Sequence, residues 1–147
     1  MNADKFVVSV VESLHGLRIA KYRVAVLAGP ACPRRRELVD QIAAATDAGY
    51  LDTLRDIMPE IGHEALGAYG PADFSGRLTR LSDDAGTSLC VDDIDPLLAT
   101  FGPERAEHFF MLASNVMPRY PVLLVTALSD LLARSEFDSH RIFTLVK

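Results

Sequence analysis

The chain has 147 residues, of which 49% are hydrophobic and 24% charged, and its formal net charge is −5. That length and apolar content suffice for one buried core, which excludes a long disordered protein and predicts one domain over residues 1–147. The net negative charge disfavours a protein that coats nucleic acid. Residues 1–36 nevertheless carry seven Lys and Arg against two Asp and Glu, so this basic part could still meet an anion.

The cysteine count, the first residues and the apolar runs predict the cellular compartment of the protein. Two cysteines, Cys32 and Cys90, are too few for a disulfide scaffold, and residues 1–4 do not resemble a secretory signal. No apolar run approaches the roughly 18–20 residues that span a bilayer. We therefore expect a cytoplasmic protein without a membrane segment.

The first third of the chain predicts a helix, a strand and a second helix. The leading amphipathic helix lies within residues 1–20 and closes near Gly16. Residues 23–28 are almost all apolar and end in Gly29-Pro30, which is typical of a strand buried on both faces. The expected apolar stripes are Val7, Val8, Val11 and Leu14 in the first helix, and Leu38, Val39, Ile42 and Ala43 in the second.

The remaining residues continue the alternation of strands and helices. Strands are expected at 49–51, 88–91, 122–126 and 141–146, helices at 103–117 and 129–133, and only short helices and loops over 52–76. Parallel neighbours need a crossover, which is usually a helix. The order therefore predicts an α/β fold: a mostly parallel five-stranded sheet with helices on both faces and no lid domain.

The first strand leaves through a degraded phosphate-binding motif. Ligands of open α/β sheets bind beyond the carboxyl ends of the strands, so the residues leaving each strand are the candidates. Over the pattern G-x-x-x-x-G-K-[ST], Gly29 matches the first glycine, while Arg34, Arg35 and Arg36 fall on the second glycine, the lysine and the hydroxyl residue. Gly29, Pro30 and the three arginines are the candidate cofactor-binding residues; the alternative is a solvated basic turn.

Two further strand ends carry polar residues that suit phosphate chemistry. Asp92-Asp93 has the form hhhh-D-[DE], in which Asp92 would lie near Mg²⁺ and Asp93 could polarise a water. Thr126 ends another apolar strand, where a polar side chain would face the γ-phosphate. The alternative for the acidic pair is two carboxylates that cap a loop.

Residues 129–143 resemble the L-L-R-x-x-R-F-D-x-x-I run that closes many AAA-type ATPase cores. In that run Arg134 takes the position of an arginine that can reach a neighbouring subunit's nucleotide. From about Val24 to Val146 the chain thus resembles the ASCE/AAA-like branch of the P-loop NTPase superfamily. Among its small members the chain is similar to the BrxF family of BREX anti-phage systems, in length, leading helix, strand-Gly-Pro turn and the acidic segment 92–95.

That resemblance implies a nucleotide-binding subunit, or a relic of one, in a complex that restricts phage DNA. Its implied cofactors are ATP and Mg²⁺, and Asp93, Thr126 and Arg134 take the catalytic positions. Its implied partners are larger proteins of a defence complex or further copies of the chain, with nucleic acid only indirectly involved and no membrane.

The departures from the motif weaken the catalytic expectation. Arg34 resists the dihedrals that glycine allows, and Pro33 removes one N–H donor of the loop. Arg36 cannot ligate Mg²⁺ and repels it, so hydrolysis by this chain alone should be slow or absent; were it active, it would be an ATP hydrolase. Two alternatives stay open: a pseudo-ATPase interaction module without nucleotide, and an anion or nucleic-acid contact through the Arg34–Arg36 cluster with Lys21 and Arg23.

Overall fold

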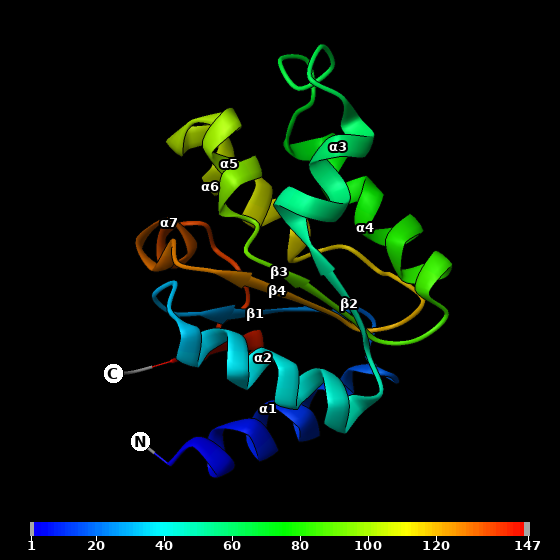
Figure 1. Cartoon of the computed structure of the whole chain (residues 1–147), viewed down its shortest axis with the longest axis vertical. Coiled ribbons are helices and arrows are strands. Elements are labelled where there is room, and N and C mark those ends of the chain that lie inside the picture. Colours follow the sequence, from blue (N-terminus) through cyan, green and yellow to red (C-terminus); the bar gives the residue numbers. More distant parts are fainter. Residues whose placement is uncertain (1, 146–147) are drawn as a thin grey trace.

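A computed structural model describes residues 2–145 of the chain, and one parallel sheet runs through it (Figure 1). The strand order is β2-β3-β4-β1-β5, and each of the pairings is parallel. The predicted five-stranded parallel sheet is therefore confirmed. The strands are β1 Val24–Ala28, β2 Gly49–Asp52, β3 Leu89–Asp92, β4 Val122–Thr126 and β5 Ile142–Thr144.

Helices cover both faces of the sheet, as predicted. Figure 1 shows α1 and α2 on one face and α3 to α7 on the other. Each face has its own apolar cluster, and β1 contributes alternate residues to the two. The helices are α1 Ala3–Leu17, α2 Pro33–Thr46, α3 Met58–Ile61, α4 Pro71–Ala85, α5 Asp95–Phe101, α6 Pro103–Ala113 and α7 Ser129–Arg134, with a π-helical turn Thr53–Ile57 and a 3₁₀ turn Ser139–Arg141.

The buried stripe of the leading helix α1 overlaps the expected one in part. Its buried residues are Val10, Leu14 and Leu17, whereas Val8 is 54% exposed. The Asn2 side chain caps the helix by accepting from the backbone N–H groups of residues 4 and 5. Helix α1 packs on α2, and the expected residues Val7 and Val11 lie partly buried against the same apolar cluster.

Helix α4 corrects the expectation of short helices and loops over 52–76. The π-helical turn and α3 account for residues 53–61, but residues 71–76 belong to a fifteen-residue helix. The Gly70 N–H donates to the Asp73 carboxylate at 2.8 Å, and Gly86 closes the helix in a left-handed conformation with φ 66°. Phe74 and Leu78 anchor it in the core with no exposed surface.

Two further bounds differ from the sequence-based expectation. Helix α6 ends at Ala113 instead of 117, and the Ser114 carbonyl after it accepts from the Arg141 guanidinium, since Pro118 has no N–H to donate to it. The last strand covers 142–144, Arg141 lies in the 3₁₀ turn before it, and Val146 lies outside the described residues. Within residues 2–145 no helix has the length and apolar character needed to cross a membrane.

Candidate functional site

The turn after β1 and the acidic segment after β3 meet at the carboxyl edge of the sheet. Strand β4 lies between the two strands, and all three run in the same direction. Arg35 Nη2 lies 3.7 Å from Asp93 Oδ1 and joins the two segments as an ion pair. The prediction that both turns share one rim is therefore confirmed.

Gly29 is fixed tightly at this rim. Its N–H donates to the Thr126 carbonyl at 2.9 Å, and a Cβ built on it would lie only 2.8 Å from the Cβ of Leu145. Leu145 in turn donates its N–H to the Ala28 carbonyl at 2.8 Å. The absence of a side chain at Gly29 therefore allows close packing against the segment after β5, independently of any phosphate binding.

Arg35 points inward, although it belongs to a run of three arginines. Helix α2 begins at Pro33, so the arginines lie in its first turn instead of in an open loop. Arg35 is only 5% exposed, and its Nη1 donates to the Gly29 carbonyl at 2.9 Å. The side chain at the motif's lysine position is thereby held by the chain's own carbonyl and by Asp93.

The neighbouring arginines point elsewhere. Arg34 is exposed, as is Pro30 in the turn. Arg36 Nε donates to Asp40 Oδ1 at 3.1 Å, which raises the pKa of the guanidinium, and that group also lies 4.4 Å from the centre of the Tyr50 ring. Arg36, which takes the position of the motif's hydroxyl residue, is therefore engaged by two neighbouring side chains, those of Asp40 and Tyr50.

The amino terminus of α2 keeps open backbone donors. Cys32 occupies the N-cap without a side-chain hydrogen bond, and Pro33 at the first helical position has no N–H. The N–H groups of Arg34 and Arg35 then lack partners within the helix, because they belong to its first turn. Such donors, with the helix dipole, favour an anion.

Asp92 is buried, and one of its two carboxylate oxygens has a hydrogen-bond partner. The residue is 5% exposed, and its Oδ2 accepts from the Tyr50 hydroxyl at 2.5 Å. Burial, followed by this contact with Asp92, raises the pKa of Tyr50 above its ordinary value. The other carboxyl oxygen, Oδ1, is buried without a hydrogen-bond partner among the described residues.

The residues at this rim do not assemble a Mg²⁺ site of the hydrolytic kind. Asp92 Oδ1 offers one open oxygen, but its second oxygen is engaged by Tyr50, and Arg36 replaces the hydroxyl ligand. Within residues 2–145 no group of three His, Cys, Asp or Glu side chains could hold a metal ion. The assignment of Asp92 as a metal ligand therefore stays a prediction.

Asp93 occupies the position from which a second acid would act on water. Its backbone is left-handed, with φ 49°, and its side chain is 41% exposed. Partial burial and then the Asp95 carboxylate raise its pKa, while Arg35 opposes that shift. The ion pair with Arg35 is thus sensitive to protonation of Asp93.

Thr126 and Arg134 have partners of their own. Thr126 is fully buried, its hydroxyl donates to Asp95 Oδ1, and the Ala127 N–H donates to Asp95 Oδ2 at 2.9 Å. Arg134 is largely exposed on α7, with Nε 3.8 Å from a carboxylate oxygen of Glu107 on α6. Thr126 therefore orients Asp95, while Arg134 lies outside the cluster of Gly29, Arg35 and Asp93.

Two residues of this rim were missed by the sequence-based prediction. Asp95 had a signal, since it is the third acid of the segment 92–95. Tyr50 had none, because its contact with Asp92 joins positions 42 residues apart.

Comparisons with known proteins agree with this architecture. Over 99% of its length the chain superposes on PCH-2 of C. elegans with a TM-score of 0.53 and 10% sequence identity. The chain has a P-loop NTPase-like fold. It spans 43% of the PCH-2 chain.

A second solved structure, the P-loop NTPase domain of the sigma-54 transport activator from E. coli, matches more loosely. The TM-score is 0.40 at 13% identity, over 100% of this chain and 99% of that one. No family model and no curated protein sequence matches the chain. The similarity therefore concerns the fold, and any activity has to be argued from the residues at the rim.

Proposed function

We propose that the chain is a P-loop NTPase-like subunit that binds nucleotide phosphates weakly and does not hydrolyse them, within a multi-protein complex of the BREX anti-phage type. The observation that carries the first part is the position of Arg35, which is buried against the Gly29 carbonyl and paired with Asp93. A phosphate must compete with both contacts before it gains this guanidinium. Weak binding follows, because much of the new interaction replaces an existing one.

Absence of hydrolysis follows from the neighbouring side chains. Arg36 supplies a cation at the place of the magnesium-binding hydroxyl and is engaged by Asp40. Asp93, the candidate for orienting a water, already faces Arg35. Phosphoryl transfer depends on a positioned metal and a positioned nucleophile, and neither position is built here.

The BREX part rests on the sequence resemblance to the BrxF family. The exposed Arg134 on α7 suits a subunit that acts beside larger partners. A gene flanked by a methyltransferase and a large ATPase in a defence cluster is the expected setting. Repeated occurrence outside such clusters would contradict this part alone.

A calorimetric titration with ATP, with and without MgCl₂, tests the nucleotide part. We expect a dissociation constant of about 1 mM, a gain of about 1.4 kcal/mol in stability at 10 mM ATP, and no phosphate release above buffer. Arg35→Ala should weaken binding about tenfold, because it removes the guanidinium that the phosphate gains. Arg80→Ala, an exposed arginine of α4, is the matched control.

The outcomes of that titration separate the candidate functions. Neither heat nor a thermal shift at 10 mM ATP would contradict nucleotide binding and leave the pseudo-ATPase interaction module. Micromolar affinity with steady turnover would contradict the non-hydrolysing proposal. Equal losses in Arg35→Ala and Arg80→Ala would show that the phosphate does not reach the α2 terminus.

The Arg35–Asp93 pair predicts that anion affinity rises as pH falls. The pKa of Asp93 is raised, so this carboxylate takes up its proton at a higher pH than an ordinary aspartate and releases Arg35. We expect sulfate, which does not itself titrate in this range, to bind more tightly at pH 5 than at pH 7, because a larger fraction of Asp93 is protonated at the lower pH.

The variant Asp93→Asn is the control for that pH dependence. It should bind sulfate at pH 7 at least as tightly as the wild type does at pH 5, with little further change on acidification. An Asp93→Asn variant that keeps the full wild-type pH dependence would show that another group is responsible.

A further inference from the structure

The amino edge of the sheet, opposite the phosphate-binding rim, carries two loops that are joined by one arginine. Arg23, just before β1, donates its Nε to the Ala20 carbonyl at 2.8 Å and its Nη1 to the Arg119 carbonyl at 2.6 Å. Its backbone N–H also donates to the Val116 carbonyl. The loop after α1 and the loop after α6 are thereby held side by side.

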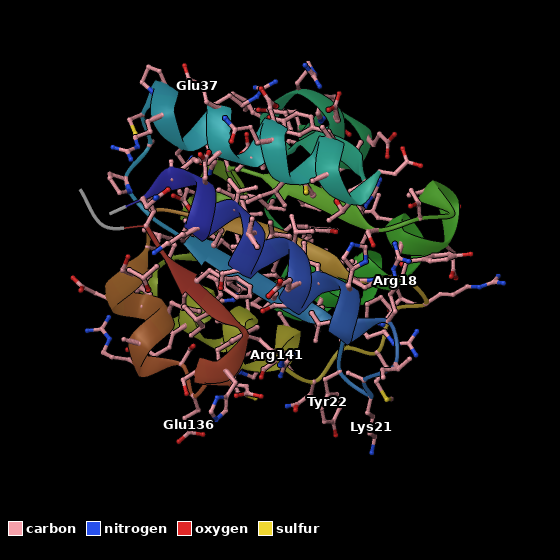
Figure 2. The ribbon with its side chains drawn as sticks, turned by 90° about the horizontal axis from the view of Figure 1, so that it is seen from below. Arg18, Lys21, Tyr22, Glu37, Glu136 and Arg141 are labelled. Atoms are coloured by element: carbon pink, nitrogen blue, oxygen red, sulfur yellow. The ribbon has the colours of Figure 1, made fainter. Side chains whose placement is uncertain are left out.

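A concave pocket of about 300 Å³ lies at this edge, and we name it the amino-edge pocket. The charged residues in its lining are both arginines, Arg18 and Arg119, and both are exposed. Figure 2 shows Arg18 near the end of α1 and Lys21 in the following loop, well separated from Glu37 on α2. The other lining residues are Gly86, Thr87, Ser88, Tyr120 and Pro121.

Arg18, Lys21 and Arg119 form no ion pair with the described part of the chain. Among residues 2–145, ion pairs within 4.0 Å engage Arg35, Arg36, Arg55, Arg77, Arg134 and Arg141. Arg18, Lys21 and Arg119 are not in that set. A protein with a net charge of −5 thus keeps two exposed arginines in the lining of one hollow, with the exposed Lys21 in the loop that follows α1, and such a hollow attracts an anion.

We propose that the amino-edge pocket binds the phosphate backbone of a single nucleic-acid strand. Guanidinium groups match phosphate oxygens in geometry and charge, so Arg18 and Arg119 suit one phosphate in the hollow while Lys21 reaches a neighbouring one. Ile19 and Met117, from the two joined loops, are 92% and 58% exposed. Such exposed apolar side chains offer van der Waals contact to unpaired bases.

The surroundings favour a strand over a lone phosphate or a membrane. The lining residue Gly86 is the C-cap of α4, and the negative end of the helix dipole weakens the hold on a single small anion. A ligand with several phosphates overcomes this, because it also engages Lys21. A flat lipid surface cannot enter a concave pocket, whereas a flexible strand can.

The test is fluorescence anisotropy of a labelled twenty-nucleotide oligothymidine at salt concentrations from 50 to 200 mM. Each single-strand phosphate neutralised contributes about −0.7 to the slope of log affinity against log salt, so three cations predict a slope of about −2 and an affinity loss of about twentyfold over this range. Arg18→Ala/Arg119→Ala should reduce the slope to about −0.7. Arg80→Ala is the matched control and should bind like the wild type.

Several results would overturn the proposal. These are salt-independent binding, an unchanged slope in the double variant, equal binding of a poly-glutamate of the same charge, and preferential binding of phosphatidylserine vesicles. Arg35→Ala should leave the oligonucleotide affinity unchanged, because Arg35 lies at the opposite edge of the sheet. Failure of the nucleic-acid proposal at the amino edge is therefore distinguishable from failure of the phosphate proposal at the carboxyl edge. A thermal melt of each variant shows whether it folds.

Discussion

Replacing Arg141 by alanine should lower the free energy of unfolding by about 3–5 kcal/mol. The guanidinium is buried, and its Nη1 donates to the Val24 carbonyl while its Nη2 donates to the Ser114 carbonyl, each at 2.7 Å. Alanine leaves both carbonyls without these donors. It also removes the packing against the rings of Tyr22 and Phe137, so the start of β1, the end of α6 and the last turn lose their common contact. Figure 2 shows Arg141 at this junction.

Urea unfolding followed by circular dichroism measures this change, provided that the transition is two-state. Arg134→Ala is the control, because that arginine is 62% exposed and only loosely paired, and it should cost less than about 0.5 kcal/mol. Arg141→Lys keeps the charge but lacks the fork of donors, so an intermediate loss is expected. A loss below about 1 kcal/mol in Arg141→Ala would show that water or other donors satisfy both carbonyls.

The sheet was predictable because most of its strands are buried on both faces. Strands β1, β3 and β4 have no exposed residue, and each is a short apolar run bounded by turn residues. Helix α4 was missed because the glycines and prolines of residues 59–71 favour loops and short helices, and this expectation was extended to residue 76. The helix itself has Phe74, Leu78 and Leu81 at helical spacing on its packed face. Its buried Ser82 is satisfied by Tyr120, because the hydroxyl donates to the Tyr120 carbonyl and accepts from the Tyr120 N–H.

The site was predictable only to the level of strand ends. Parallel strands bring Gly29 and the segment 92–95 to one edge, which the sequence pattern could anticipate. The inward turn of Arg35 could not be anticipated, since three successive arginines suggest a solvated turn and the partner Asp93 becomes a neighbour only in the fold. The contact of Tyr50 with Asp92 likewise depends on the pairing of β2 with β3.

Replacing Phe109 by alanine should cost about 3–5 kcal/mol in the free energy of unfolding. Phe109 has no exposed surface, and its ring stacks on that of Phe74 with centroids 4.8 Å apart and an interplanar angle of 16°. The ring of Phe110 is tilted by 58° to that of Phe109, with centroids 5.7 Å apart. The stack joins α6 to α4, so alanine would open a cavity between the two helices that cover this face of the sheet.

A double-mutant cycle with Phe74→Ala separates the stack from simple loss of volume. If the rings stabilise each other, the two losses should be non-additive by about 1 kcal/mol. Phe109→Leu should cost less than Phe109→Ala because leucine fills part of the cavity, and Met117→Ala on the exposed amino edge should change stability by less than about 0.5 kcal/mol. Additive losses would mean that each ring is held by the surrounding aliphatic core instead of by the other. The packing of the two helices would then depend on the other buried residues of the same cluster, such as Leu78 of α4 and Ala106 and Ala113 of α6.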